Sequence, residues 1–198
     1  MGKNKDFKFD KRAASYDEGF EGRLSKRFYN LLLNRIELKQ GDTVLDVGCG
    51  TGSVLKKLAE LTNIIGYGID IEEKMIIEAM SKCPDMSISI SSCTQTPFEN
   101  CTFDIATTCM AYHHFNDKKG FAKEVSRILK TGGYLYITDP RFPLIIRKPL
   151  NLALRIHKIA GHFSTPKEIE SIFNKYGFTL VDVGFDKYAQ CVKLKKVK

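Results

Sequence analysis

The stretch that most constrains this chain of 198 residues runs from Thr43 to Leu55 and reads TVLDVGCGTGSVL. Its first five residues are mostly apolar, as in a strand that is buried inside a parallel sheet. Gly48, Gly50 and Gly52 follow at every second position. Glycine lets the backbone turn sharply and bring its N–H groups against a ligand at the start of a helix. The stretch therefore predicts a strand, a loop and a helix that bind a nucleotide-like ligand.

The glycine spacing and two acidic residues limit the kind of ligand. A dinucleotide-binding loop has the pattern G-x-G-x-x-G, whereas this loop is GxGxG with Ser53 next. Asp46, two residues before the loop, would repel a pyrophosphate and suit a cationic ammonium or sulfonium group. Asp70 closes the next apolar run, 22 residues beyond Gly48, where an acidic side chain accepts hydrogen bonds from both ribose hydroxyls. A cationic ligand that contains a ribose is therefore predicted.

Four strings in this order, LDVGCGTG, GID, TPFENCTFDIATTCMAYHHF and RILKTGGYLYITD, resemble the class I S-adenosylmethionine-dependent methyltransferases. The resemblance is closest to the small-molecule branch that includes the ubiquinone and menaquinone biosynthesis C-methyltransferases. It covers residues 8 to 140 well and the remainder poorly. It implies S-adenosyl-L-methionine as cofactor, S-adenosyl-L-homocysteine as product, and a small-molecule methyl acceptor that is apolar or anionic.

The resemblance also implies which residues hold the cofactor. The Y-D of an AxxYD string places Tyr16 over the sulfonium as an aromatic lid, with packing at a helix start as the alternative. Ser92 replaces the family's acidic residue for the adenine amino group, so Ser92 and the Cys93 N–H would hold the ring instead; plain strand-end roles are the alternative. The expected cofactor-binding residues are Tyr16, Asp46, Gly48, Cys49, Gly50, Gly52, Asp70, Ile71, Ser92, Cys93 and Cys109.

Apolar periodicity and turn residues divide the chain into alternating strands and helices. We expect strands at 44–47, 63–70, 86–91, 103–109, 134–138, 178–185 and 188–194, and helices at 24–36, 53–61, 72–82, 116–130, 143–160 and 166–176. Together with the resemblance, this order predicts an α/β, Rossmann-like, doubly wound fold. Its seven-stranded, mostly parallel sheet has the order 3-2-1-4-5-7-6 with the last strand antiparallel, plus an N-terminal helical cap and a helical insertion after strand 5.

We expect a single methyltransferase domain over residues 1–198. It consists of an N-terminal helical cap (1–40), a cofactor-binding core (41–139), a substrate-lid insertion (140–164) and a C-terminal helix and strand pair (165–198). The insertion contains an amphipathic helix with one apolar and one basic side. One role for it is a lid that dips toward a membrane surface or an anionic substrate. The other, which we favour, is a helix packed on the core with a solvated basic face.

Methyl transfer from a sulfonium needs few catalytic side chains, because alignment of the reacting centres supplies much of the rate. A base helps when the acceptor is a phenol, an enol carbon or a thiol, and histidine has a suitable pKa near ~6.5. His113 and His114 follow the fourth strand at the ligand edge, and His162 precedes the last helix at the same edge. These three are the candidates, with surface or packing roles as the alternative, and no catalytic residue is assigned.

The formal net charge of +8 is unevenly distributed. Residues 41–140 carry 9 Lys/Arg against 13 Asp/Glu, whereas residues 1–40 carry 10 against 6 and residues 141–198 carry 12 against 4. No apolar run is long enough to span a membrane and the start lacks a signal-peptide centre, so we expect a cytoplasmic protein with peripheral membrane contact at most. Six cysteines without a CxxC pair predict reduced thiols and no metal site.

Three other functions are weighed against this one. Basic flanks around an acidic core are typical of a surface that tracks a nucleic-acid backbone, as in an RNA or tRNA methyltransferase. Against this, the fourth strand lacks the N/D-P-P-Y string of amino-methylating enzymes. The serine at position 92 favours a non-catalytic partner subunit with the same fold. An NAD-dependent oxidoreductase is disfavoured by the glycine spacing.

Overall fold

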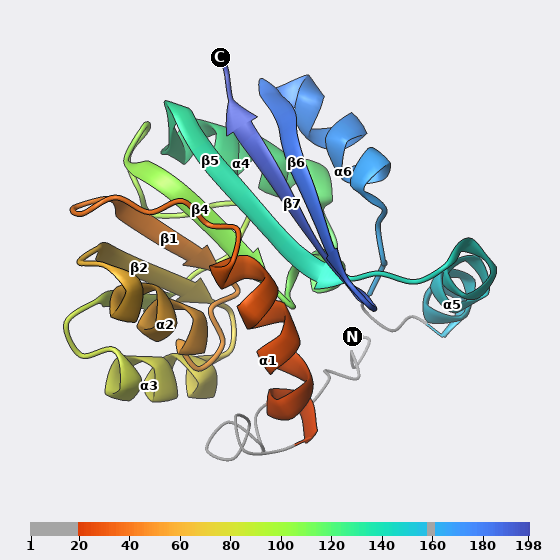
Figure 1. The fold of residues 1–198 in the computed structure, drawn as a ribbon, viewed down its shortest axis with the longest axis horizontal. Coiled ribbons are helices and arrows are strands. Elements are labelled where there is room, and N and C mark those ends of the chain that lie inside the picture. The colour runs from red at the N-terminus through yellow and green to blue at the C-terminus, as the bar shows by residue number, and fades with distance from the viewer. Residues whose placement is uncertain (1–19, 158–160) are drawn as a thin grey trace, which may run out of the picture.

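The structure, a computed structural model, describes residues 20–157 and 161–198. Its seven strands are β1 (Thr43–Val47), β2 (Ile65–Asp70), β3 (Ser87–Ile90), β4 (Phe103–Cys109), β5 (Leu129–Pro140), β6 (Phe178–Asp186) and β7 (Ala189–Lys196). They form one sheet in the order β3-β2-β1-β4-β5-β7-β6 (Figure 1). β7 runs antiparallel to β5 and β6, and the other pairs are parallel. The predicted fold class, strand order and antiparallel last strand are confirmed.

Helices cover both faces of this sheet. α1 (Phe20–Leu33), α2 (Ser53–Leu61) and α3 (Glu73–Lys82) lie on one face, and α4 (Lys118–Ile128) and α6 (Pro166–Phe173) lie on the other (Figure 1). Short 3₁₀ turns, η3 (Tyr112–His114) and η4 (Asn174–Tyr176), follow β4 and α6. α5 (Leu144–Ile156) stands clear of the sheet. The result is a three-layer α/β arrangement with one helix outside it.

Three apolar clusters hold the helices to the sheet, and one of them joins α3 to α2 and β3. On one face, side chains of α4 and α6, including Phe121, Val125 and Phe173, are buried with residues of the central strands. On the other face, Phe28 of α1 and Leu58 of α2 are buried with residues of β1, β4 and β5. These positions repeat at helical spacing, which is why the periodicity of the sequence located the helices.

The junction between α4 and β5 differs from the prediction. We expected a helix over residues 116–130 and a strand that starts at residue 134, but α4 ends at Ile128 and β5 begins at Leu129. Leu129 is fully buried. A Cβ at Gly133 would lie 2.7 Å from the carbonyl oxygen of Asp104 in β4. Gly132 and Gly133 both lie within β5, and at Gly133 only a residue without a side chain allows β5 to pass so close to β4.

α5 does not pack on the core with a solvated basic face, so the role that we favoured for it is wrong. Its large apolar side chains are exposed, by 48 to 84%, at Leu144, Ile145, Ile146, Leu152 and Ile156. Arg147 is buried instead and forms an ion pair with Glu168 (Nη1 to Oε2, 2.6 Å). The segment that faces α5 offers carbonyl and carboxylate oxygens, so Arg147 and Asn151 turn inward, whereas Lys148 and Arg155 stay exposed.

Two predictions concern residues outside the described ranges. Tyr16 and the first half of the predicted cap precede residue 20, and the end of the predicted helix at 143–160 falls on residues 158–160. Within residues 20–157 and 161–198, no helix combines the length and apolarity that crossing a membrane requires.

Candidate functional site

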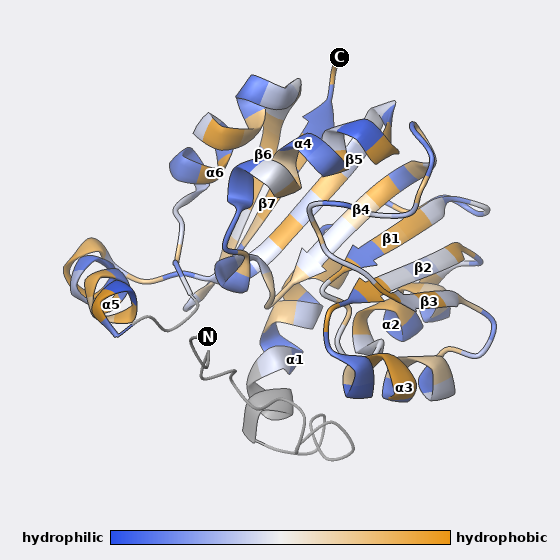
Figure 2. Cartoon of the chain, turned by 180° about the vertical axis from the view of Figure 1, so that it is seen from behind, coloured by the Kyte–Doolittle hydropathy of each residue, from blue (hydrophilic) through white to orange (hydrophobic). Residues whose placement is uncertain are grey.

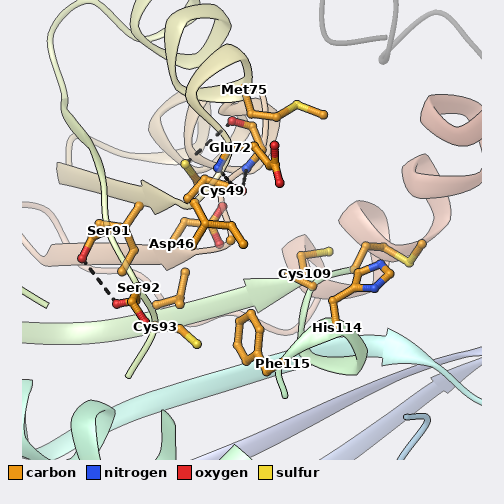
Figure 3. Close-up of a pocket in the computed structure, with 18 of the residues that line it drawn as sticks. Asp46, Cys49, Glu72, Met75, Ser91, Ser92, Cys93, Cys109, His114 and Phe115 are labelled. Atoms are coloured by element: carbon orange, nitrogen blue, oxygen red, sulfur yellow. Dashed lines mark hydrogen bonds between the residues drawn. The ribbon is translucent and has the colours of Figure 1, made fainter. Parts of the chain in front are cut away.

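A cavity of about 540 Å³ lies at the carboxyl ends of β1, β2 and β4 (Figure 3). Ligands bind at this edge in doubly wound folds, because the loops that follow parallel strands meet there. Most of the predicted cofactor-binding residues line this cavity: Asp46, Gly48, Cys49, Gly50, Asp70, Ile71, Ser92, Cys93 and Cys109. The fold thus brings together side chains from four segments that are separate in the sequence.

The glycine loop is held by β2 through its N–H groups. The nitrogens of Gly48 and Cys49 both donate to the carbonyl oxygen of Ile69 (2.8 and 3.0 Å), and the nitrogen of Gly50 donates to Asp70 Oδ2 (2.9 Å). The prediction that these three N–H groups face the ligand is wrong, because those of Gly48 and Cys49 extend the pairing of β1 with β2 and that of Gly50 holds the Asp70 carboxylate. The loop instead gives the ligand space, since a Cβ at Gly50 would have no atom within 4 Å.

Gly52 was predicted to bind the cofactor, but it does not line the cavity. It precedes α2 with φ +78°, and a Cβ there would lie 3.2 Å from Ala79 Cβ and from Cys83 Sγ. Both contacts belong to α3 and its C-terminal end. The third glycine of the loop therefore serves the close approach of α2 to α3.

Asp46 is a carboxyl group in β1 that is only 1% exposed. Thr107 Oγ1 donates a hydrogen bond to its Oδ1 (2.7 Å). Burial raises the pKa of Asp46 to about 7; the Thr107 hydrogen bond opposes this shift and the charge of Asp70 adds to it. A cation in the cavity would stabilise the ionised carboxylate and lower its pKa. Asp46 is therefore preorganised for a cationic ligand.

The other charged side chains of the cavity have the same sign. Asp70, Glu72 and Asp117 also line it, and among the residues that the structure describes no Lys or Arg does. The segment between β2 and α3 fixes the Asp70 side chain, because the backbone nitrogen of Glu72 donates a hydrogen bond to Asp70 Oδ1 (3.0 Å). Each carboxylate oxygen retains a second lone pair for a ligand hydroxyl. Such a cavity attracts a cation and repels a pyrophosphate.

Ser92 and Cys93 lie at one side of the cavity, and His114 lies at the opposite side (Figure 3). Ser92 Oγ accepts a hydrogen bond from the nitrogen of Thr94 (3.2 Å) and shares another with Thr94 Oγ1 (3.0 Å). Burial raises the pKa of the Cys93 thiol to about 11, so this thiol is neutral at physiological pH. Ser92 and Cys93 therefore contribute polar, uncharged side chains to the cavity.

A buried Asp–His pair stands beside the cavity. His113 Nδ1 lies 2.7 Å from Asp139 Oδ1, and the two residues are 7% and 0% exposed. His113 lines the cavity from η3, and β5 supplies Asp139. An aspartate that accepts the Nδ1 proton leaves Nε2 as the nitrogen that acts on a substrate. The sequence pointed to His113 but not to Asp139, because no local pattern links two positions that are paired only by the fold.

The other two candidate histidines differ in position. His114 lines the cavity, and its ring centroid lies 3.9 Å from that of His113. His162 does not line it: the side chain is exposed, and the backbone nitrogen donates to the carbonyl oxygen of His113 (2.7 Å). The structure therefore brings two of the three candidates together and leaves His162 outside.

Several lining residues are not among the site residues that the sequence predicted. They are Tyr29 of α1, Glu72 and Met75 at α3, and Met110 and Phe115 after β4. Met110 has φ +59°, which is uncommon for a residue other than glycine. No group of three or more His, Cys, Asp or Glu side chains within residues 20–157 and 161–198 is placed to hold a metal ion.

Known methyltransferases resemble this chain in sequence. A model of the methyltransferase domain matches residues 45–137. An uncharacterized methyltransferase from Anoxybacillus flavithermus is 27% identical over 206 residues, which cover 95% of this chain and 96% of that protein. The demethylmenaquinone methyltransferase of Chlorobaculum tepidum is 27% identical over 167 residues, which cover 77% of this chain and 69% of that protein.

One solved structure resembles nearly the whole chain. It belongs to the complex between the Haloferax volcanii Trm112 methyltransferase activator and a methyltransferase. The TM-score is 0.82 at 20% identity, and the match covers 96% of this chain and 98% of that one. At this level of identity the likeness establishes the fold alone.

Proposed function

We propose that this chain, which a model of the methyltransferase domain matches over residues 45–137 and which resembles known methyltransferases, is a class I S-adenosylmethionine-dependent methyltransferase that transfers the methyl group to a small molecule. The observation that carries the proposal is the buried carboxyl of Asp46 in a cavity lined by acidic side chains. Among the described residues, no Lys or Arg lines this cavity. Such a cavity stabilises a sulfonium cation, whereas it repels the pyrophosphate of a dinucleotide.

The residues present fit this cofactor. Asp46 is suited to its cationic end, Asp70 and Glu72 to its ribose hydroxyls, and Ser92 with Cys93 to its adenine. When bound, S-adenosylmethionine supplies a methyl group on a sulfonium whose leaving group is a neutral thioether. Residues that close the cavity exclude water and align the acceptor; Tyr16, outside the described residues, is our proposed lid.

We assign proton removal from the acceptor to His113. Asp139 holds the imidazole through Nδ1 and stabilises the imidazolium that forms when Nε2 takes the proton. This arrangement suits an acceptor with an acidic proton, such as a phenol, an enol carbon or a thiol. Met75, Met110 and Phe115 add an apolar part to the lining, which suits an acceptor with an apolar body.

A reduced quinone or a related phenol is the first acceptor to test. One relative of this chain is a demethylmenaquinone methyltransferase, and a quinol combines an acidic proton with an apolar body. The proposal for this chain is the chemical class, which includes simpler phenols and thiols.

Isothermal titration with S-adenosylmethionine, S-adenosylhomocysteine and NADH tests the cofactor. Micromolar binding of the first two without binding of NADH supports the proposal. No heat from the first two, in a folded sample that mass spectrometry shows to be free of bound cofactor, contradicts it. Methyl transfer to quinols, phenols, thiols and lipids, with total tRNA in parallel, then separates the small-molecule function from the RNA alternative.

A second candidate function is that of a subunit that works with a partner protein. The structural neighbour in complex with an activator favours it, as does Ser92 in the place of an acidic residue. If the isolated chain binds neither ligand, affinity purification from its native cells followed by cofactor titration of the complex decides between an activated enzyme and a non-catalytic subunit.

The proposal also includes the role of each segment of the domain and the cellular compartment of the protein. We assign cofactor binding to residues 41–139 and contact with the acceptor to residues 140–164, within a single domain. We place the protein in the cytoplasm, because all six cysteines are free thiols in the structure and thiols remain reduced in that compartment.

A further inference from the structure

α5 has the opposite orientation to an ordinary surface helix. An amphipathic helix on a globular protein buries its apolar stripe and exposes its polar side. In α5 the buried residue is Arg147, whereas Ile145, Leu152 and Ile156 are 84, 48 and 65% exposed. These three residues share one side of the helix, opposite Arg147, and we call them the apolar stripe. The stripe is the part of α5 that lacks a covering surface among the described residues.

Polar contacts fix this orientation. Arg147 Nη1 donates to Glu168 Oε2 (2.6 Å), at the start of α6. Asn151 Nδ2 donates to the carbonyl oxygen of Phe163 (3.0 Å), and the nitrogen of Phe163 donates back to Asn151 Oδ1 (2.9 Å). α5 is therefore anchored through its polar side, and the apolar stripe points away from the protein.

The charges around the stripe have one sign. Lys148 and Arg155 are exposed beside it, and no acidic residue occurs between Asp139 and Glu168. An apolar stripe edged by basic side chains is the composition of a helix that lies in the interface of an anionic membrane. A second copy of this chain would bring like charge against it, and a nucleic acid would leave the apolar side chains uncovered.

We propose that α5 is an interfacial anchor that binds this protein reversibly to an anionic lipid surface. Its 13 residues form a helix of about 20 Å that lies in the membrane plane. The apolar stripe enters the acyl boundary, and Lys148 with Arg155 contacts the lipid phosphates. Figure 2 shows α5 well apart from the sheet, with hydrophobic and hydrophilic bands along it. Among the described residues the apolar stripe is exposed, which leaves it free to meet a flat surface.

The anchor is connected to the proposed base by a short segment. The ring of Phe163, whose backbone Asn151 holds, stacks on the ring of His113 with centroids 5.0 Å apart. Docking of α5 therefore brings the His113 side of the cavity toward the lipid, which is the source of an apolar acceptor. This last step rests on the proposed function, whereas the lipid binding itself does not.

Vesicle co-sedimentation of the full chain tests the anchor. We expect binding to equimolar phosphatidylcholine and phosphatidylglycerol, little binding to phosphatidylcholine alone, and weaker binding at high salt. The double variant Ile145→Asn/Ile156→Asn should lose at least about tenfold in partition coefficient. The double variant Lys148→Gln/Arg155→Gln should lose about fivefold per charge.

Ile77→Asn is the matched control, because Ile77 of α3 is 59% exposed on another surface; it should bind as the wild type does. All substituted side chains are exposed, so the variants should fold, and thermal melting checks this. Equal binding to both vesicle types, no binding to either, or full binding by Ile145→Asn/Ile156→Asn would overturn the proposal.

Two further measurements identify other occupants. Sedimentation velocity without lipid tests for a dimer. If the wild type is a dimer and Ile145→Asn/Ile156→Asn is a monomer, a second copy of this chain covers the apolar stripe. Binding of total tRNA that the same variant abolishes would assign it to RNA; either result overturns the lipid anchor. Vesicle binding needs no cofactor. Failure of the lipid anchor therefore shows in the vesicle experiment, and failure of the proposed function shows in the cofactor titration.

Discussion

Two buried aspartates, Asp46 in the cavity and Asp139 behind His113, differ in their partners. Asp46 in β1 receives a hydrogen bond from Thr107, whereas Asp139 in β5 is paired with His113. β4 lies between their strands, and both residues are at most 1% exposed. Equal burial thus supports different roles: the first carboxyl, with its pKa raised to about 7, suits a cationic ligand, and the second orients a base.

The largest expected effect tests the Asp139 side. His113→Ala should lower kcat by about 10²–10⁴-fold for an acceptor with an acidic proton, because general-base catalysis contributes that much. The dissociation constant of S-adenosylmethionine should stay nearly the same. Initial rates and isothermal titration measure the two quantities.

Two variants control for this result. His162→Ala alters a side chain outside the cavity and should keep kcat. Asp139→Asn should also lower kcat, because the imidazolium that forms on proton transfer loses its partner. If His113→Ala weakened cofactor binding and left kcat unchanged, His113 would bind the cofactor and would not act as the base.

The next effect tests the Asp46 side through stability. The pKa of Asp46 is about 7 in the folded protein against an ordinary 3.8, so the folded state keeps a proton that the unfolded state has lost. This term favours folding less as pH rises from about 4 to 7. Asp46→Asn should therefore raise the free energy of unfolding by on the order of 2–4 kcal/mol at pH 8, with a smaller gain at pH 5. Urea unfolding at both values measures it.

The same variant should weaken the binding of S-adenosylmethionine, and wild-type affinity should rise from pH 6 to pH 8, because the cation favours ionised Asp46. Asp104→Asn is the matched control of opposite sign: although desolvation opposes it, hydrogen bonds from Lys130 and Thr43 lower the pKa of Asp104, so this variant should destabilise the protein at neutral pH. If the affinity of the wild type for S-adenosylmethionine did not depend on pH, the cation of the cofactor would not lie beside Asp46.

A smaller effect is expected at Asp70, which extends the acidic side of the cavity. Asp70→Ala should weaken S-adenosylmethionine binding by about 1.5–3 kcal/mol, the contribution of hydrogen bonds to a charged group. Isothermal titration measures the loss, and thermal melting checks the loop that Asp70 holds through Gly50. An unchanged dissociation constant would show that the ribose lies elsewhere.

The smallest effect concerns Ser92, an uncharged residue of the cavity lining. Ser92→Asp should tighten cofactor binding by about 0.5–1.5 kcal/mol, because a carboxylate accepts the hydrogen bond of the adenine amino group better than a hydroxyl does. Titration with neutral adenosine separates this contact from the added negative charge, and Ser92→Ala is the control. A loss of adenosine affinity in Ser92→Asp would place the adenine away from Ser92.

The glycine loop shows which features a local sequence pattern predicts and which it does not. The strand, the loop and α2 were predictable, because an apolar run and its glycines are adjacent in the chain. The direction of the loop N–H groups was not, because the carbonyl of Ile69 in another strand accepts two of them. The packing role of Gly52 likewise depends on Ala79 and Cys83 of a later segment.

The two helices after β5 show the same limit. The capping box of Thr165 and Glu168 at the start of α6 is present in the structure, because all of its groups lie within four residues. The amphipathic pattern of α5 predicted a helix and its two sides correctly. It did not predict which side faces inward, because Glu168 and Phe163 decide that.

The sequence, read with its family resemblance, determined the order of strands and helices, the strand order of the sheet and the edge at which the cavity forms. Periodicity and turn residues act locally, and the carboxyl ends of parallel strands necessarily converge. Tertiary structure alone decided that Asp139 holds His113, that burial raises the pKa of Asp46 to about 7, and that α5 turns its apolar stripe outward. Burial and pairing depend on neighbours that are distant in the chain, and no local pattern records them.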